Sequence, residues 1–327
     1  MMSQQTTHSL PYRVLLYYKY VTIDNPIEES KKHLELCKSL ELKGRILFAH
    51  EGINGTVSGT VEQTQEYMRI MHEDPRFHDM WFKIDEEPEH TFRKMFVRPK
   101  KELVTFRLSE DVNPLEKTGT YLQPKEWYDM MQDPDIVIID GRTDYEWDLG
   151  HFKGAIRPSV ESFKEFPEWI EKNLSDFKDK KMLTYCTGGI RCEKLSAYLL
   201  KQGFNEVYQL HGGIVNYGKD AEVKGALFDG TCYVFDERVS VPINHTEDAN
   251  LISHCVHCGK PTDSYVNCGN FDCHRQHFQC LECVAKTNCS CSETCMESPR
   301  HEYKPPFNRK FESYRRVPRR NQTAAEK

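Results

Sequence analysis

Residues 181–203 read "KMLTYCTGGIRCEKLSAYLLKQG". The apolar run before the first cysteine predicts a strand over 182–185, and the spacing of apolar residues predicts a helix over 193–201. The turn between these elements runs from Cys186 to Arg191. Parallel α/β sheets carry their reactive groups at the carboxyl ends of strands. Cys186 therefore stands where a strand, a tight turn and a helix N-terminus can build a site.

The flanking sequence continues this alternation between residues 120 and 217. Strand-like runs occur at 135–140 ("DIVIID") and 206–210 ("EVYQL"), and a helix-like segment occurs at 166–174 ("FPEWIEKNL"). Short apolar runs that alternate with helices predict a parallel sheet covered by helices on both faces. This section of the chain is therefore expected to have an α/β fold.

The turn has the composition of a thiolate site. Backbone N–H groups at a helix N-terminus and the fixed charge of Arg191 stabilise a thiolate, so we expect a lowered pKa for Cys186. Gly188 and Gly189 permit the tight turn because they accept backbone angles that a Cβ would forbid. Cys186 and Arg191 are the candidate catalytic residues, and the active-site loop between them consists of Thr187, Gly188, Gly189 and Ile190.

Other interpretations of these cysteines remain open. A free cysteine is most often a packed core residue, and Cys186 could be one. Cys192 could form a disulfide or a persulfide with Cys186, or lie unreactive in the first helical turn. The loop has C-x4-R spacing, one residue shorter than the spacing a phosphatase loop of this type needs.

Residues 10–108 carry a different order of elements. Strand and helix signals follow one another as β-α-β-β-α-β, which is the ferredoxin-like α+β pattern. Asn54-Gly55 is the strongest short hairpin signal and predicts a turn between two strands. Further strand structure is expected at 81–85 and 101–106.

The third section of the chain, residues 228–300, is rich in cysteine, and nine of the 13 cysteines fall between Cys255 and Cys295. This section has little periodic apolar pattern, so it cannot rely on a core of its own. Its cysteines form four pairs at spacings typical of zinc ligands. Their interleaved order predicts two structural zinc ions, the first pair binding with the third and the second with the fourth. The predicted ligands are Cys255, Cys258, Cys268, Cys273, Cys280, Cys283, Cys291 and Cys295.

Individual ligands in this module have possible substitutes. The candidates are Cys289, His254, His257, His274 and His277. A reduced loop without metal is the alternative, although metal binding would supply the folding free energy that the section lacks. A structural role is favoured over a catalytic one because four thiolates leave no open coordination position.

Charge is unevenly distributed along the chain, whose net charge is −6. Residues 92–107 hold six basic side chains and one acidic one, and residues 300–327 hold nine basic and three acidic. Two basic islands on an acidic body favour a polyanion bound at a defined place, with plain surface charge as the alternative. The candidate RNA-binding residues are Arg93, Lys94, Arg98, Lys100, Lys101, Arg315 and Arg316.

The length of 327 residues predicts two or three domains. We place them at 10–110, 120–220 and 228–300, followed by a basic tail at 301–327 that we expect to be disordered. No run approaches the roughly 18 apolar residues of a membrane span, and the N-terminus lacks the layout of a secretory signal. We therefore expect a cytoplasmic protein without a membrane partner, in which cysteines serve metal binding or thiol chemistry.

Longer motifs carry a resemblance to a known family. The stretches "DGRTDYEWDLGHFKGAIRPS" (140–159), "YCTGGIRCEK" (185–194) and "LHGGIVNY" (210–217) resemble a rhodanese domain. Together with "HEGINGTVSG" (50–59) and "CGKPTDSYVNC" (258–268), they make almost the whole chain similar to the rhodanese-type tRNA uridine(34) hydroxylases. The resemblance implies a rhodanese-like sheet preceded by an acylphosphatase-like, ferredoxin-like domain and followed by a zinc-stabilised cysteine-rich module.

The resemblance also implies an activity. That family places an oxygen atom on C5 of the wobble uridine of tRNA, with molecular oxygen as co-substrate and the anticodon stem-loop as partner. Cys186 is then the essential residue, whereas Asp140, Arg142, Glu146 and His151 tie the loop to the sheet. Such an oxidation usually needs a metal or an organic cofactor, but the chain shows no dinucleotide fingerprint and no P-loop. The electron donor stays open.

Three hypotheses for the function follow. In the first, a Cys186 thiolate at the floor of a cleft between domains attacks C6 of a splayed uracil and activates C5. In the second, the chain is a sulfurtransferase that carries a persulfide on Cys186. In the third, it is a zinc-supported RNA-binding scaffold, against which the intact Cys186 and Arg191 argue.

Overall fold

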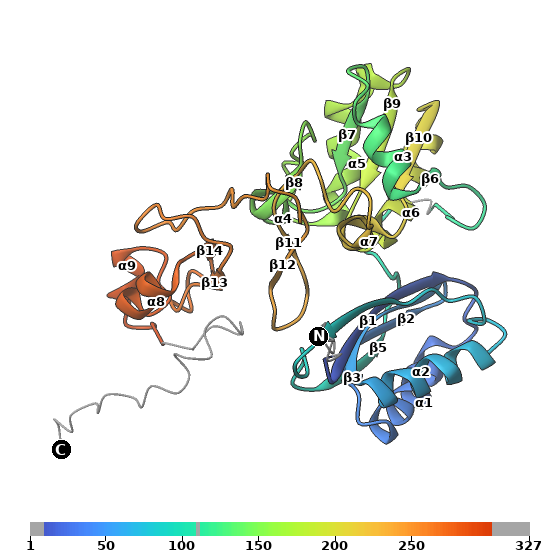
Figure 1. Ribbon diagram of the computed structural model, residues 1–327, viewed down its shortest axis with the longest axis horizontal. Helices are drawn as coiled ribbons and strands as arrows, with labels where there is room; N and C mark the ends of the chain where they lie inside the picture. The colour runs from blue at the N-terminus through green and yellow to red at the C-terminus, as the bar shows by residue number, and fades with distance from the viewer. Residues whose placement is uncertain (1–9, 109–111, 303–327) are drawn as a thin grey trace, which may run out of the picture.

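The computed structural model describes residues 10–108 and 112–302. The first part of the chain forms one sheet with two helices, and we call it the ferredoxin-like part (Figure 1). Its elements are β1 (Tyr12–Tyr20), α1 (Pro26–Ser39), β2 (Lys43–Ala49), β3 (Gly52–Thr60), α2 (Val61–Glu73), β4 (Lys83–Glu87) and β5 (Met95–Pro99). The strand order is β4-β1-β3-β2-β5. Antiparallel pairing of β1 with β3 and β4, and of β2 with β3, confirms the predicted pattern, and β5 adds a parallel edge strand.

Both helices begin at residues suited to that position. The Asn25 side chain accepts a hydrogen bond from the N–H of Glu28 at 3.2 Å, and Pro26 takes the first helical position of α1. Thr60 and Gln63 form a capping box at the start of α2. The local sequence therefore fixes where each helix starts.

Alternation along the strands gives this sheet two different faces. Leu15 and Tyr17 are fully buried in the core that the sheet shares with α1 and α2. Leu16, Tyr18 and Leu47 point to the opposite side because successive side chains of a strand face opposite ways. The second face, which no helix of this part covers, packs on the rest of the molecule.

The predicted hairpin exists, but its turn was predicted at the wrong place. The turn lies at residues 50–51, and Asn54-Gly55 lies inside β3. A side chain at position 55 would collide with the ring of Tyr17. Gly55 therefore makes room for a packed ring and does not form a turn.

The strand predicted at 101–106 is wrong, and β5 forms earlier in the chain. Leu103, Val104 and Phe106 are buried in the core that also contains residues of α6. The ring of Phe106 stacks on Phe163 with centroids 4.9 Å apart. These apolar residues connect two parts of the molecule, a role that a short apolar run does not distinguish from a strand.

The middle of the chain forms the parallel-sheet part. Its elements are β6 (Thr120–Leu122), α3 (Pro124–Met130), β7 (Val137–Asp140), α4 (Asp144–Leu149), β8 (Gly150–Phe152), α5 (Phe166–Asn173), β9 (Lys181–Tyr185), α6 (Ile190–Lys201), β10 (Glu206–Leu210) and α7 (Gly213–Lys219), with short 3-10 turns at Phe163–Glu165 and Ser175–Phe177. The strand order is β6-β10-β9-β7, and every pairing is parallel. One core contains residues of α5 and α6, and the other contains residues of α3 and α7. Helices cover both faces, as the sequence predicts.

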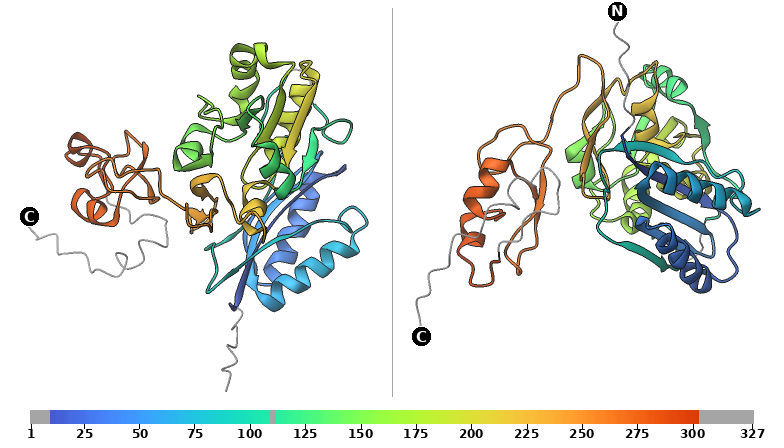
Figure 2. Two further views of the ribbon diagram at one scale, coloured as in Figure 1. Left: turned by 45° about the horizontal axis from the view of Figure 1, so that its top comes forward. Right: turned by 60° about the horizontal axis from the view of Figure 1, so that its bottom comes forward.

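The rest of the chain first returns to the parallel-sheet part and then leaves it. β11 (Phe228–Tyr233) pairs with β8 and with β12 (Ser240–Pro242). The following cysteine-rich part contains β13 (Tyr265–Asn267), β14 (Gln276–Phe278), α8 (Leu281–Thr287) and α9 (Glu293–Met296). Figure 2 shows this part, in orange and red, standing to one side of the two α/β parts.

The ferredoxin-like part docks on the parallel-sheet part through buried charges as well as apolar contacts. The Lys194 ammonium group is fully buried and pairs with Glu51 at 2.8 Å and Glu102 at 3.4 Å. On the other side of the interface, Asp85 of β4 pairs with Lys219 and with Arg238. These contacts fix the sheet over the N-terminus of α6.

Among the helices in residues 10–108 and 112–302, none combines the length and apolar character needed to cross a membrane.

Candidate functional site

The Cys186 loop connects the end of β9 to the start of α6, as predicted, but α6 begins three residues earlier than predicted, so Ile190 and Arg191 lie in its first turn. Gly189 precedes the helix with φ of +102°, a backbone conformation that L side chains rarely adopt. Its N–H donates a hydrogen bond to Cys186 Sγ at 3.2 Å. The loop thus presents a backbone donor to the sulfur.

The N-terminus of α7 also holds the Cys186 loop in place, a role that the sequence motifs did not indicate. The N–H groups at the start of α7 donate to the Cys186 loop, from Ile214 to the Cys186 carbonyl at 3.0 Å and from Val215 to the Thr187 carbonyl at 3.1 Å. A Cβ at Gly213 would lie 2.5 Å from the Cys186 carbonyl oxygen. Close backbone approach therefore requires glycine at this position.

Arg191 does not stand free beside the sulfur but forms a two-pronged ion pair with Glu146. Its two terminal nitrogens lie 2.7 and 2.8 Å from the carboxylate oxygens, and one also donates to Thr187 Oγ1 at 3.2 Å. Burial alone would raise the pKa of Glu146, but the charge and hydrogen bonds of Arg191 outweigh it and lower that pKa to about 2. Glu146 therefore stays ionised and fixes the guanidinium.

The Cys186 thiol is acidic for a buried group. Burial would raise its pKa, but a hydrogen bond from the Cys192 thiol, the charge of Arg191 and nearby backbone N–H groups lower the pKa to about 6. Burial and the neighbouring Cys186 raise the pKa of Cys192 well above its ordinary value. Cys192 thus stays protonated at neutral pH and acts as a donor to the thiolate, which favours its unreactive interpretation.

Cys186 is less open than the sequence led us to expect. The residue has 0% of its surface exposed. The ferredoxin-like sheet covers the loop, since a Cβ at Gly188 would lie 3.0 Å from Leu16 Cδ2 and one at Gly189 would lie 2.9 Å from the Tyr18 hydroxyl. The expected cleft between the two α/β parts exists, but the ferredoxin-like sheet covers the loop, and the sulfur is not exposed to solvent.

Cys186 nevertheless belongs to the lining of a cavity of about 470 Å³ between the two α/β parts. Its walls include Leu16, Tyr18, Leu47, Asn54 and Thr56 from the ferredoxin-like sheet, and Cys186, Thr187, Gly188, Ile190 and Arg191 from the loop and the first turn of α6. We call it the thiol cavity. Three further basic side chains, Arg45, Lys100 and Lys164, also line it, so an anionic ligand would meet positive charge there.

The upstream motif supports the loop from inside the sheet, as the resemblance implied. The Arg142 guanidinium is fully buried and bonds to Asp140 at 2.6 and 2.9 Å and to the Gly150 carbonyl at 2.6 Å. The Tyr185 hydroxyl donates to the same Asp140 carboxylate at 2.7 Å. His151 bonds to the Trp147 carbonyl at 2.9 Å. These residues anchor β7, β8 and β9 around the loop.

A buried lysine near the thiol was missed by sequence reasoning. Lys83 of β4 is 5% exposed, and its ammonium group lies over the rings of Tyr18 and Trp81 at 5.0 and 4.7 Å from their centroids. Burial lowers its pKa to about 8, although the charge of Cys186 opposes this change. The sequence gives no signal for it because Lys83 reaches the loop only through domain docking.

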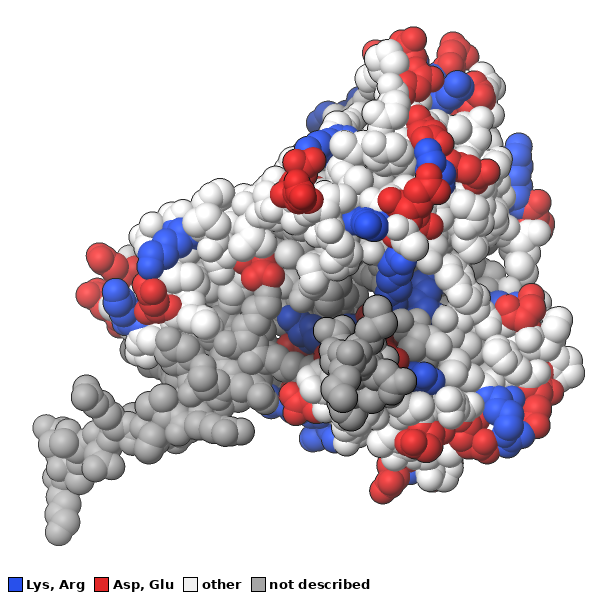
Figure 3. Space-filling model, viewed as in Figure 1, with Lys and Arg blue, Asp and Glu red and all other residues white. Residues whose placement is uncertain are grey.

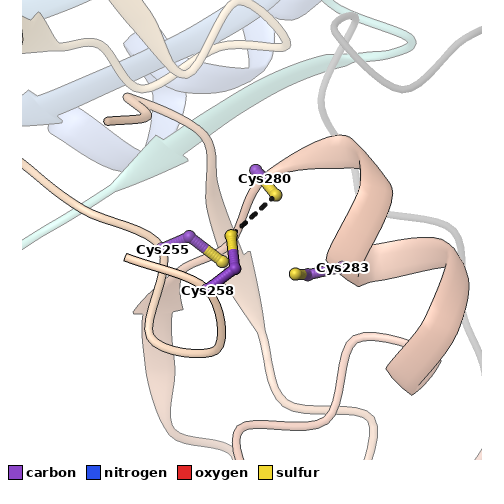
Figure 4. Close-up of side chains that lie close together, drawn as sticks. All are labelled: Cys255, Cys258, Cys280 and Cys283. Carbon is purple, nitrogen blue, oxygen red and sulfur yellow. Dashed lines mark hydrogen bonds between the residues drawn. The ribbon is translucent and has the colours of Figure 1, made fainter. Parts of the chain in front are cut away.

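The eight predicted cysteines gather into two groups of four, in the crossed arrangement predicted from their order. One group is Cys255, Cys258, Cys280 and Cys283, and the other is Cys268, Cys273, Cys291 and Cys295. Figure 4 shows the first group converging between a loop and the start of α8. Within the described residues, no histidine and no Cys289 joins either group.

The spacing of the sulfur atoms fits a tetrahedral metal site. All ligand atoms of a group lie within 4.8 Å of one another. The distances from Cys258 to Cys280, from Cys273 to Cys291 and from Cys291 to Cys295 are 3.6, 3.7 and 3.6 Å. Zn–S bonds of about 2.3 Å at tetrahedral angles place sulfur atoms about 3.8 Å apart. Each group can hold one metal ion, and zinc fits it.

The predicted RNA-binding residues divide by position. Lys100 lines the thiol cavity, and Arg93 pairs with Glu237 at 2.5 Å beside it. The exposed side chains of Lys94, Arg98 and Lys101 follow the edge strand β5 and its flanks and do not line that cavity. The predicted residues Arg315 and Arg316, and the tail from residue 303, lie outside the described residues.

Comparison with known proteins adds the following findings. Family models match in the order UPF0176 acylphosphatase-like domain over residues 12–103, rhodanese-like domain over 123–220 and rhodanase C-terminal over 229–296. Curated relatives named tRNA uridine(34) hydroxylase, from Bacillus mycoides and Bacillus cereus, are each 58% identical to this chain. The identity extends over 293 residues, which is 90% of this chain and 92% of each relative. These matches confirm the resemblance and the predicted fold class.

Proposed function

Because the chain belongs to the tRNA uridine(34) hydroxylase family, we propose that it hydroxylates C5 of the wobble uridine of tRNA to give 5-hydroxyuridine. The observation that carries the proposal is the 58% identity to hydroxylases over 90% of the chain. An acidic thiol at a cavity between two parts of the molecule agrees with it. A wobble base is unpaired in its loop and can enter such a cavity without breaking a duplex.

Cys186 acts as the nucleophile in this proposal. With a pKa of about 6, the thiol is ionised at neutral pH. The thiolate attacks C6 of uracil and forms a C–S bond, and the electron pair of the C5–C6 double bond moves to C5. C5 thereby becomes nucleophilic. The fixed ion pair of Arg191 with Glu146 holds the loop in the geometry that the attack requires.

Molecular oxygen is the oxidant in this proposal. One of its atoms bonds to C5, and the other leaves as water, so each turnover consumes two electrons and two protons from an external donor. Loss of the C5 proton and of the thiolate from C6 restores the double bond of the ring. Cys186 is then free for the next substrate.

The anticodon stem-loop is the proposed region of contact, in a protein that we place in the cytoplasm. Figure 3 shows Lys and Arg side chains within the hollow between the parallel-sheet part and the ferredoxin-like part. Phosphate groups bind such charges without regard to sequence and set the position of the RNA. Arg93, Lys94, Arg98, Lys100 and Lys101, with Arg315 and Arg316 of the tail, supply these contacts in our proposal.

Two structural zinc ions complete the proposal, one in each cysteine group. Zinc bound by four thiolates has no open position for a substrate, so it contributes folding free energy and takes no part in the reaction.

The test of the function is nucleoside mass spectrometry of tRNA from a strain that lacks the gene. We expect 5-hydroxyuridine and its derivatives to disappear, and the wild-type gene to restore them. The Cys186→Ser variant should restore nothing while the purified variant still binds tRNA, because serine keeps the size of the side chain but lacks an ionisable thiol. Modification by the Cys186→Ser variant would exclude the thiolate mechanism.

A sulfurtransferase is the second candidate, because a six-residue loop with an acidic cysteine also suits a persulfide. Thiosulfate and cyanide assay this activity directly. Loss of a thiolated nucleoside in the same deletion strain, with 5-hydroxyuridine unchanged, would favour it over hydroxylation.

A further inference from the structure

A second cavity of about 750 Å³ lies beside the thiol cavity. Its walls come from the ferredoxin-like part, from the segment around β11 and β12, and from the cysteine-rich part. Arg45, Phe92 and Phe235 line both cavities. The two cavities therefore meet at these three side chains, and a ligand that fills one can continue into the other.

The walls of the second cavity are rich in aromatic side chains. Five of them line it, namely Phe92, Tyr233, Phe235, Tyr265 and Phe271. Phe235 is 55% exposed, an unusual state for a large apolar ring. Tyr233 and Tyr265 hold one another edge to face at 5.8 Å, and Tyr265 stacks on Tyr145 at 5.4 Å. Rings that are fixed in this way offer preformed surfaces on which unpaired bases stack.

The polar groups of this lining suit a nucleotide. The amide side chain of Asn267 can bond to the edge of a base, as single-stranded RNA recognition requires, and Gln276 can donate from its Nε2 while its Oε1 accepts from the Tyr265 hydroxyl at 2.8 Å. Asp236, an acidic residue in the wall, pairs with Arg238 at 2.6 Å, and the same guanidinium also pairs with Asp85 and Glu87 at 2.9 and 3.1 Å. The ion pair reduces the negative charge of Asp236, Glu302 adds a second acidic group to the lining, and Arg45 and Arg93 supply its basic groups.

Arg45 lies where the two cavities meet. It is an exposed residue of β2, and within residues 10–108 and 112–302 no carboxylate forms a salt bridge with it. An arginine without a carboxylate partner at the junction of two base-sized spaces can bind a phosphate with two parallel hydrogen bonds.

From these observations we infer that the second cavity binds the base of a nucleotide adjacent to the modified uridine, and that Arg45 binds the phosphate between the two nucleotides. This inference rests on the proposed function. The target uracil occupies the thiol cavity, the neighbouring base stacks on the aromatic wall, and the chain passes Phe92 and Phe235. The cysteine-rich part supplies Tyr265 and Phe271 to that wall, so it acts as an RNA-binding element of the site.

A double-mutant cycle, which combines a protein variant with an RNA that lacks one base, tests the stacking contact. The full-length protein with its metal is titrated with the anticodon stem-loop RNA, and with the same RNA lacking the base on one or the other side of uridine 34. We expect the loss of one of these bases, and separately the Phe271→Leu substitution, to weaken wild-type binding by about ten-fold each. If ring and base contact one another, Phe271→Leu should weaken binding of the matching abasic RNA no further.

Phe235→Ala provides a second variant in case Phe271→Leu loses metal, since Phe235 is exposed and lies outside the cysteine groups. Metal content and thermal unfolding establish that each variant is folded. Fully additive losses for both variants and both abasic RNAs, or no loss at all, would overturn the inference.

A salt titration tests Arg45. Arg45→Gln should weaken binding and reduce the slope of log affinity against log salt by about 0.7, the value for one phosphate contact on a single strand. Lys31→Gln removes one charge from the exposed surface of α1 and should leave the slope unchanged. An unchanged slope for Arg45→Gln would contradict the assigned phosphate contact.

Parallel measurement of 5-hydroxyuridine with wild-type protein separates this inference from the proposed function. If the wild-type protein hydroxylates tRNA and the cycles show no coupling, only the second base site is wrong. If no hydroxylation occurs and the cycles do show coupling, the RNA contact stands and the proposed reaction fails.

Discussion

At the residue scale, the acidity of Cys186 results from opposing contributions. Complete burial disfavours a thiolate, whereas the Cys192 thiol, Arg191 and backbone N–H groups favour it. Glu146 pairs directly with the same guanidinium, so groups farther from Arg191 experience less of its positive charge. The loop is thus balanced so that the thiol ionises near neutral pH without exposing a free arginine.

Arg191→Gln should raise the pKa of Cys186 by about one unit, because an opposite charge at this range shifts a pKa by roughly one to three units. The thiolate then persists only at higher pH, so hydroxylation at pH 6 should fall more than at pH 8. The ultraviolet absorbance of the thiolate, taken as the difference from Cys186→Ser across pH, measures the midpoint. Arg157→Gln, which removes a surface ion pair of the same part, should leave the midpoint unchanged.

The same substitution leaves Glu146 buried without its cation, at a cost of about 3 kcal/mol in the free energy of unfolding. The double variant Glu146→Gln with Arg191→Gln has two neutral amides at these positions and should recover part of that stability. A Cys186 midpoint that stays near 6 in both variants would show that the backbone N–H groups and Cys192 suffice to ionise the thiol.

Sequence reasoning predicted the turn that brings Cys186 and Arg191 together, and the structure shows that turn, but the sequence did not predict how closed the site is. The loop motif is local, so residue types and spacing predict its geometry. Leu16, Tyr18 and Lys83 lie more than 100 positions away in the chain and reach the loop only through docking of a sheet face. The nearly continuous apolar run at residues 14–18 indicates a strand covered on both faces but does not show what covers the second face.

At the element scale, two glycines with similar backbone angles allow the cost of a left-handed backbone to be distinguished from the effect of contact with the Cys186 loop. Gly213, with φ of +70°, begins α7, and Gly203, with φ of +85°, follows the end of α6. Only Gly213 lies against the Cys186 loop. Each Gly→Ala change should lower the free energy of unfolding by about 1 kcal/mol, because alanine disfavours a left-handed backbone. Gly213→Ala should also reduce hydroxylation about 100-fold by displacing the loop, whereas Gly203→Ala has open space and should retain activity.

Chemical unfolding and a tRNA hydroxylation assay on the same two variants measure these effects. Full activity in Gly213→Ala would show that α7 does not set the position of the loop.

The zinc proposal is tested on single ligands. Elemental analysis should find two zinc ions per chain in wild-type protein and one in Cys258→Ser, because the remaining three thiolates of that group hold the ion less tightly. Cys289→Ala changes a buried cysteine outside both groups, so it should keep both ions. Loss of zinc from Cys289→Ala would add Cys289 to the ligand set.

Element order in the chain was predictable, and element details were not. Four short cysteine spacings indicated the crossed pairing that the structure shows, because each pair brings its own turn. Asn54-Gly55 gave a wrong position for the hairpin turn, because glycine occurs at sites of close packing as well as in turns. At Gly55 the ring of Tyr17 occupies the space that a side chain would need. Local sequence does not distinguish these two uses.

At the scale of the whole molecule, the two α/β parts share one core. Tyr20 and Ala49 of the ferredoxin-like part are buried together with Leu195 and Tyr198 of α6. The thiol cavity exists only where these parts meet, since its walls come from both. Composition and motifs predict three sections of chain, but the site depends on a docking geometry that no single section specifies.

The Lys194 contact offers a test of that docking. Its ammonium group is fully buried, and Glu51 and Glu102, which are partly exposed, hold it from the ferredoxin-like side. Lys194→Met keeps the length of the side chain but leaves two carboxylates without their cation. We expect a loss of about 2 kcal/mol in the free energy of unfolding, less than for a fully buried pair because solvent reaches the carboxylates.

Hydroxylation should fall at least about ten-fold in Lys194→Met, because a misplaced sheet displaces the wall that positions the uracil. The pKa of Cys186 should change little, since Arg191, Glu146 and the loop N–H groups lie within the parallel-sheet part. Lys172→Met replaces an exposed lysine of α5 and should change neither stability nor activity. If Lys194→Met loses stability but hydroxylates at the wild-type rate, the ferredoxin-like sheet does not form part of the catalytic site, and the reaction must take place on the Cys186 loop alone.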